Sequence, residues 1–125
     1  MRAAAAVATA IVLHVLLPGP LLAADEKGQE AFNNNCRTCH SWKEGDNRLG
    51  PSLHGVVGRK AGTAPGFGFS GAMKSSGITW DDASLDKFVT NPNGLVPNNN
   101  MKPFGGIADA ATRKQIIDFL KSNPG

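Results

Sequence analysis

The sequence predicts a small all-α domain, in which three short helices are joined by long loops that wrap around a bound group. Apolar residues recur at helical spacing in separate segments, and no stretch alternates apolar and polar residues as a strand would. In addition, the run Cys36-Arg37-Thr38-Cys39-His40 contains the only two cysteines among 125 residues. Long loops argue against a compact domain unless they have a function, and enclosing an attached group is such a function.

The C-x-x-C-H spacing is the one that covalent haem attachment requires. Each cysteine sulfur can form a thioether bond to one haem vinyl group. His40 follows directly, which brings an imidazole nitrogen within reach of the iron. We therefore expect one haem c, bound through Cys36 and Cys39, with His40 as an axial ligand.

Three other interpretations of the motif are weaker. A redox dithiol of the thioredoxin type calls for a βαβ pattern around the cysteines, and none is present. A zinc site needs a second pair of ligands, and only His54 lies nearby in the sequence. A disulfide that closes so short a loop would constrain the unfolded chain little.

The first expected helix covers roughly residues 26–34 and leads into the motif, with Ala31 and Phe32 on its inner side. Gly28 lies one turn before Phe32, where the missing side chain would let another helix approach closely. The third helix starts after Asp109 as N-cap and ends at Asn123-Pro124-Gly125. Its apolar stripe at i, i+3 and i+4 consists of Ile116, Phe119 and Leu120.

The second expected helix follows Thr79, a possible N-cap. Asp81 and Asp82 fall in its first turn, where the helix dipole favours acidic side chains. It must stop before Asn91-Pro92, because the residue before a proline disfavours the helical conformation. The residues expected to face inward are Leu85, Phe88 and Val89.

Residues 1–24 have the three regions of a secretory signal peptide: a basic Arg2, an apolar run over 3–17, and small residues at the end. The apolar run is short for a membrane anchor, so we expect cleavage near Ala23 or Ala24 and no stable membrane insertion. Export of a protein with a C-x-x-C-H motif predicts a location in the bacterial periplasm.

The remainder, residues 25–125, is long enough for one domain. Loss of Arg2 from the 13 basic residues would leave 12 against 10 acidic ones, and there is no basic run. This balance does not suggest nucleic-acid binding. We expect a monomer.

Several segments occur in a distinctive order and spacing: Cys36-Arg37-Thr38-Cys39-His40, Leu49-Gly50-Pro51-Ser52-Leu53-His54-Gly55, Gly58-Arg59-Lys60-Ala61-Gly62, Ala64-Pro65-Gly66-Phe67, Gly77-Ile78-Thr79-Trp80 and Asn91-Pro92. Together they resemble a class I cytochrome c of the mitochondrial and small bacterial type. The likeness runs from Lys27 to the C-terminus. It implies a fold in which the N- and C-terminal helices cross, with Gly28, Phe32 and Phe119 at the crossing.

The resemblance implies that Met101 is the second axial ligand, because the loop around it matches the methionine-ligand loop of the family. A thioether ligand raises the reduction potential. The alternative is that Met101 only fills the core. Met73, the other methionine after the signal, is interpreted as a packing residue. His54 could ligate the iron in principle, but it matches a surface histidine of the family that is not a ligand.

Further roles follow from the same resemblance. Pro51 should offer its carbonyl to the free ring N–H of His40, which fixes the imidazole. Arg59 and the indole N–H of Trp80 match residues that contact a buried haem propionate, although Trp80 can also fill the core. The chain has no tyrosine, and Phe69 and Phe88 stand where the family usually has one.

We therefore expect a one-electron carrier rather than an enzyme. It would shuttle electrons between a donor dehydrogenase or bc-type complex and an acceptor such as an oxidase. One alternative is a small haem peroxidase or gas-binding protein, but that needs an open sixth position and a distal acid–base group. Another is a permanent electron-transfer subunit of one enzyme, which a large exposed apolar patch would favour.

Overall fold

The structure is a computed structural model that describes residues 3–6, 9–17 and 19–122. Within these ranges the regular structure consists of helices: α1 (Pro20–Asn35), α2 (Gly71–Lys74), α3 (Asp82–Thr90), α4 (Pro92–Leu95) and α5 (Ala110–Ser122). The described residues form no β-strand, and one isolated antiparallel bridge joins Lys60 to Thr79. The predicted all-α fold with long loops is confirmed.

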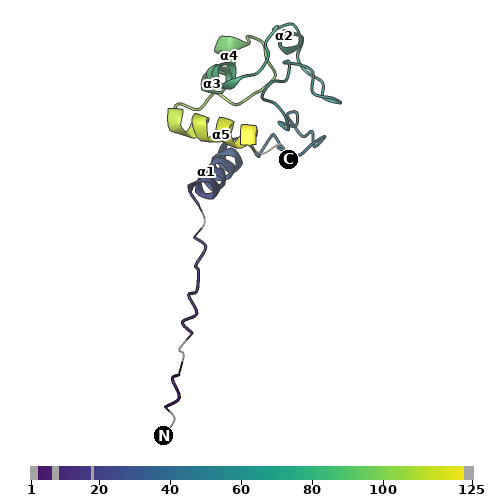
Figure 1. Cartoon of the computed structure of the whole chain (residues 1–125). Helices are drawn as coiled ribbons and strands as arrows, with labels where there is room; N and C mark the ends of the chain where they lie inside the picture. Colours follow the sequence, from purple (N-terminus) through teal and green to yellow (C-terminus); the bar gives the residue numbers. More distant parts are fainter. Residues whose placement is uncertain (1–2, 7–8, 18, 123–125) are drawn as a thin grey trace.

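The first and last helices cross, and α5 lies over α1 in Figure 1. Gly28 stands at the crossing: a Cβ there would lie 2.6 Å from Phe119 Cβ and 2.9 Å from the Gln115 carbonyl oxygen. The rings of Phe32 and Phe119 are 5.9 Å apart, and Trp42 meets both edge-on at 5.3 and 5.4 Å. The close approach expected at Gly28 is therefore confirmed.

Helix α1 begins earlier than the expected start near residue 26. Pro20 occupies the first helical turn, where its fixed φ suits a helix. Its missing N–H costs no hydrogen bond, because N–H groups in the first turn have no acceptor within the helix. The predicted signal cleavage site at Ala23 or Ala24 therefore lies within this helix. At its other end, the Cys36 N–H donates to the Phe32 carbonyl oxygen over 2.7 Å, so the helix leads directly into the haem motif.

Helix α3 is capped by Asp81 rather than by Thr79. The Asp81 carboxylate accepts from the Ser84 N–H over 2.7 Å, and the Ser84 hydroxyl accepts from the Asp81 N–H over 2.9 Å. This reciprocal capping box satisfies two N–H groups that Thr79 cannot reach. Helix α3 ends at Thr90, as the following Asn91-Pro92 predicted.

The N-cap expected for the last helix is confirmed, because Asp109 Oδ2 accepts from the Thr112 N–H over 2.9 Å. The single-turn helices α2 and α4 were not predicted, since four residues are too few to show an apolar period. Their caps are local: the Ser70 hydroxyl accepts from the Met73 N–H, and the Asn91 side chain accepts from the Gly94 N–H. The end expected at Asn123-Pro124-Gly125 lies outside the described residues.

The core lies between the long helices and the segment over residues 50–80, which consists of loops and the short helix α2. The inward positions expected on α3 and α5 are buried, with Val89 only partly so. Helix α3 is tied to α5 by Arg113, whose Nε donates to Asp86 Oδ1 over 2.7 Å and whose Nη1 donates to the Ile107 and Ala108 carbonyls. The buried apolar side chains are Ala31, Phe32, Val56, Ala61, Ala64, Met73, Trp80, Leu85, Phe88, Val96, Ile107, Ile116, Ile117, Phe119 and Leu120.

The N-terminal segment differs from the rest of the chain. Its described residues, 3–6 and 9–17, have no regular secondary structure, and they extend away from the helices in Figure 1. Leu13, Leu16 and Leu17 are each at least 80% exposed. In the described ranges, no helix has the length and apolar character to span a membrane. Arg2, the basic residue of the predicted signal peptide, lies outside them.

Candidate haem site

The C-x-x-C-H motif forms one tight turn directly after α1. The N–H groups of Cys39 and His40 both donate to the Cys36 carbonyl oxygen, over 3.1 and 2.9 Å. This turn leaves the two cysteines half-buried and buries the His40 side chain. Two sulfur atoms and one imidazole are thus held close together by backbone bonds of a single segment.

The two cysteines are free thiols, and the environment of Cys36 does not favour a thiolate. Burial, and to a lesser extent the neighbouring Cys39, raises the pKa of the Cys36 thiol to about 12. Redox-active and metal-binding cysteines act as thiolates and usually have a lowered pKa. The raised pKa of Cys36 therefore does not support a reactive dithiol.

His40 is oriented by its hydrogen bond to Pro51. Its Nδ1 lies 2.7 Å from the Pro51 carbonyl oxygen. A carbonyl can only accept, so Nδ1 carries the proton and Nε2 keeps a free lone pair. Burial lowers the pKa of His40, the positive charge of Arg59 lowers it further, and the bond to Pro51 opposes both. A neutral imidazole with a fixed ring and a free Nε2 is the form that binds a metal.

Gly50 is a site residue that the sequence reasoning missed. A Cβ at this position would lie 2.7 Å from His40 Nδ1 and 2.8 Å from Nε2, so any larger residue would displace the ring. The Gly50 N–H also donates to the Cys39 carbonyl over 2.7 Å, which ties the loop to the motif. The glycine directly before Pro51 was a signal that could have identified it.

Arg59 and Trp80, far apart in sequence, are brought together through their backbones. The Trp80 N–H donates to the Arg59 carbonyl over 2.9 Å. Trp80 is buried with its ring 5.1 Å from Phe88. Arg59 Nη1 donates to the Ser52 and His54 carbonyls over 3.0 and 3.1 Å, and partial burial lowers its pKa. Guanidinium and indole N–H groups are both donors that suit an anionic carboxylate.

Met101 lies in the loop after α4 and is partly buried against the core. Its main-chain N–H donates to Asn99 Oδ1 over 2.9 Å. Met73, by contrast, is a buried core residue on α2, as expected for a packing role. His54 is half-buried rather than on the surface, and its buried Nδ1 has no hydrogen-bond partner among the described residues.

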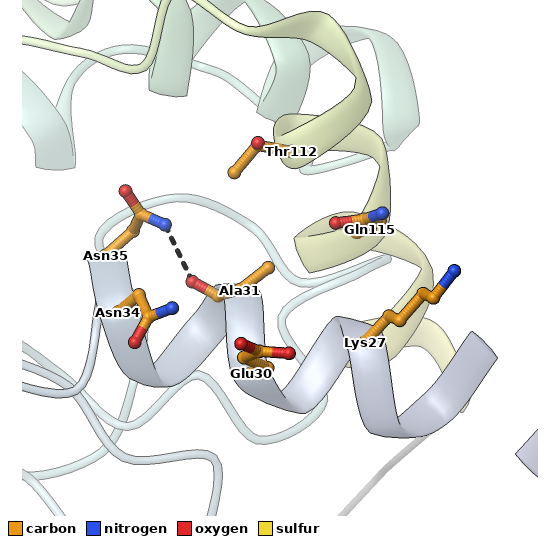
Figure 2. A pocket seen from close by; sticks show the side chains of 7 residues that line it. All are labelled: Lys27, Glu30, Ala31, Asn34, Asn35, Thr112 and Gln115. Atoms are coloured by element: carbon orange, nitrogen blue, oxygen red, sulfur yellow. Dashed lines mark hydrogen bonds between the residues drawn. The ribbon is translucent and has the colours of Figure 1, made fainter. Parts of the chain in front are cut away.

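A polar cleft of about 380 Å³ lies beside the crossing of α1 and α5 and is separate from these groups (Figure 2). The Asn35 side chain at its edge donates to the Ala31 carbonyl over 2.8 Å. None of the site residues expected from the sequence lines this cleft. Within the described part of the chain, no three His, Cys, Asp or Glu side chains gather closely enough to hold a metal ion. The cleft is lined by Lys27, Glu30, Ala31, Asn34, Asn35, Thr112 and Gln115.

Family models, curated relatives and solved structures all match this chain to cytochromes c. The family model described as cytochrome c matches residues 26–124. A cytochrome c of Euglena viridis is 42% identical over 97 residues, which cover 78% of this chain and 94% of the relative. Cytochrome c2 iso-2 of Magnetospirillum fulvum is 47% identical over 87 residues, with coverage of 70% and 90%. The solved structure of cytochrome cH from Methylobacterium extorquens is 42% identical, covers 79% of this chain and 98% of its own, and superposes with a TM-score of 0.72.

Proposed function

Because the chain belongs to the cytochrome c family of electron carriers, we propose that it is a periplasmic one-electron carrier whose iron is held by His40 and Met101. The observation that carries this proposal is the neutral, buried His40 whose Nδ1 is bound to Pro51 and whose Nε2 is free. An electron carrier needs such a ligand because it must keep the same geometry in both oxidation states.

The family binds haem c covalently, and this chain has the two required cysteines, Cys36 and Cys39, at the required spacing. When bound, haem c supplies the reversible one-electron chemistry of its iron. The residues present fit this group, because two free thiols and one oriented imidazole come from a single turn.

The protein's own residues would control the environment of the iron. Pro51 keeps the His40 proton on Nδ1 and so fixes which nitrogen is the ligand. Met101 would occupy the sixth position and exclude water from it. Arg59 and Trp80 would donate hydrogen bonds to a propionate, and the positive charge of Arg59 would keep that carboxylate ionised.

We propose further that the carrier exchanges electrons with a donor dehydrogenase or bc-type complex and with an acceptor such as an oxidase. The surface around Met101 supports brief encounters rather than a permanent complex. The described core domain exposes Leu49 but no cluster of large apolar side chains, and lasting interfaces are usually more apolar.

The test of the carrier function is a spectroscopic redox titration of the haem-loaded protein, followed by exposure to hydrogen peroxide. We expect one reversible step with the slope of a single electron and no sustained consumption of peroxide. Steady peroxide turnover, a ferric spectrum typical of a bound water, or rapid cyanide binding would contradict the carrier function. Each result would instead indicate a haem enzyme or a ligand-binding protein.

The periplasmic location is supported by the charge and apolar pattern of residues 1–24. Measuring the intact mass of the exported protein tests it directly. We expect a mass that lacks the segment ending near Ala23 or Ala24 and includes one haem. Retention of the whole segment on the haem-loaded protein would contradict the predicted cleavage.

A further inference from the structure

Asn99 makes an unusual set of contacts in the loop that carries Met101. Its side chain is buried, with only 2% of the residue exposed. A buried amide that is not fully hydrogen-bonded is unfavourable, so the partners of this side chain decide its role. It is one of three consecutive asparagines, and its neighbours Asn98 and Asn100 are exposed.

The Asn99 amide uses both its acceptor and its donors. Asn99 Oδ1 accepts from the Met101 N–H over 2.9 Å. Nδ2 donates to the Val96 carbonyl over 2.9 Å and to Asn93 Oδ1 over 3.0 Å. An N–H can only donate and a carbonyl can only accept, so these partners allow one orientation of the amide.

These bonds connect Met101 to a fixed part of the fold. Asn93 lies in α4, and Val96 is the buried residue that directly follows this helix. The loop between Val96 and Met101 turns at Asn98, which has a positive φ of 64°. Asparagine tolerates that conformation better than most residues. The main chain at Met101 is therefore attached through one side chain to the end of α4.

We propose that Asn99 is a positioning residue that holds Met101 in the orientation required for axial ligation. The proposal rests on the ligand role of Met101 proposed above. Asn99 supplies no ligand atom; it limits the movement of the Met101 backbone through its hydrogen bond and so reduces the fraction of molecules in which the Met101 side chain lies away from the iron. Without this restraint, Met101 should compete less well for the iron, and added ligands should bind there with higher affinity.

The test compares haem-loaded Asn99→Ala with Asn100→Ala. The control removes an exposed asparagine from the same loop, one with no side-chain hydrogen bond to a described residue. We expect Asn99→Ala to weaken the far-red sulfur-to-iron absorption band of the ferric protein. It should also bind imidazole, which competes for the sixth position, about tenfold more tightly, as expected from loss of a buried hydrogen bond. Asn100→Ala should match the unchanged protein in both respects.

A graded variant separates positioning from general destabilisation. Asn93→Ala removes only the outer partner of Asn99 and should give a smaller change of the same kind. If Asn99→Ala keeps the full band and the original imidazole affinity, the positioning role is wrong while the ligand role of Met101 stands. If the unchanged protein lacks the band, both proposals fail.

Amide hydrogen exchange on the unchanged haem-loaded protein gives a second test that does not depend on folding of the variant. The Met101 N–H should exchange markedly more slowly than the Asn100 N–H, because only the former has an acceptor in the structure. Equal, fast exchange at both positions would overturn the proposal even if Asn99→Ala failed to fold.

Discussion

At the scale of single residues, the site depends on how groups beside His40 restrict it. Pro51 accepts its Nδ1 proton, and Gly50 leaves the space that the ring occupies. Burial, and to a lesser extent the charge of Arg59, lowers the pKa of His40, while the bond to Pro51 opposes this effect. The orientation and the protonated nitrogen of the His40 imidazole are thus determined by neighbouring residues.

The first prediction concerns Gly50→Ala. The added Cβ would lie within 3 Å of the imidazole nitrogens, and a rigid aromatic ring cannot move aside without losing its bond to Pro51. We expect the free energy of unfolding to fall by about 1–3 kcal/mol, the usual range for overpacking, and the yield of haem-loaded protein to fall with it. Chemical denaturation and the haem-to-protein absorbance ratio measure the two effects.

Gly68→Ala is the matched control, because a Cβ there meets no atom within 4 Å and the backbone has no positive φ. It should leave both the stability and the haem content unchanged. Equal behaviour of the two variants would show that the space beside His40 is not restricted as the structure indicates.

At the scale of helices, the crossing of α1 and α5 organises the fold. Phe32 and Phe119 are almost completely buried there, and burying one such ring contributes about 1.5–3 kcal/mol. Trp42, two residues after His40, packs against both rings. The helix crossing and the haem motif are consequently joined by one aromatic cluster, so a disturbance of the crossing should reach the site.

The second prediction concerns Gly28→Ala. Within an open helix, alanine is about 0.5–1 kcal/mol more favourable than glycine. At Gly28 the Cβ would meet Phe119 Cβ at 2.6 Å and a backbone oxygen at 2.9 Å, so the helices must separate. We expect net destabilisation of about 1–3 kcal/mol in equilibrium unfolding.

Gly71→Ala in α2 serves as its control, since that position is open. Stability of this variant should be unchanged or slightly higher. A stabilising effect of Gly28→Ala itself would mean that the helices do not approach each other at Gly28.

The third prediction concerns the cap of α5. Hydrogen bonds from the Thr112 hydroxyl and N–H lower the pKa of the exposed Asp109 carboxyl below its usual 3.8. Between the folded and unfolded pKa values, the unfolded chain binds more protons, so stability rises with pH. The contribution is present above about 3.8 and is lost as the pH falls through the folded value.

Asp109→Asn keeps a capping side chain but removes this titration. Its free energy of unfolding should therefore decline less steeply than that of the unchanged protein as the pH falls from 5 toward 2, measured by urea unfolding at several pH values. Identical slopes for the two proteins would show that the Asp109 carboxylate does not act as the cap.

Much of this could be predicted from the sequence, because its signals are local. The haem motif, the glycine at the crossing and the cap of α5 are each visible within a few residues. The start of α1, the cap of α3 and the one-turn helices were not, since helix ends depend on competing caps. Gly50 and Asn99 were missed because their importance lies in contacts with His40, Val96 and Met101 that only the folded chain creates.

At the scale of the whole molecule, the face around Met101 carries little charge. Asn93, Gly94 and Asn100 are exposed and neutral there, and the exposed Lys102 directly after Met101 adds a single positive charge. Elsewhere on the described domain, the exposed Arg48 pairs with Asp46 at 3.0 Å, which offsets part of its charge. Long-range attraction of acidic partners should therefore be weak, and encounters should depend on short-range fit.

The fourth prediction follows for electron exchange with hexacyanoferrate, an anionic reagent. Strong steering changes association rates by 10–10³-fold with ionic strength, whereas we expect less than about tenfold here. The variant Asn100→Lys, which removes no side-chain hydrogen bond to a described residue, should make the rate, measured by stopped-flow absorbance, more salt-dependent. A steep dependence without the added lysine would contradict the view of a weakly charged face.

We propose that His40 and Met101 are the two axial ligands of the iron. The most direct measurement is the visible absorption spectrum of the ferric haem-loaded protein, compared with Met101→Ala and with Met73→Ala as the control methionine. We expect a far-red sulfur-to-iron band that Met73→Ala retains and Met101→Ala loses. A high-spin spectrum without this band in the unchanged protein, or a band that survives in Met101→Ala, would contradict it.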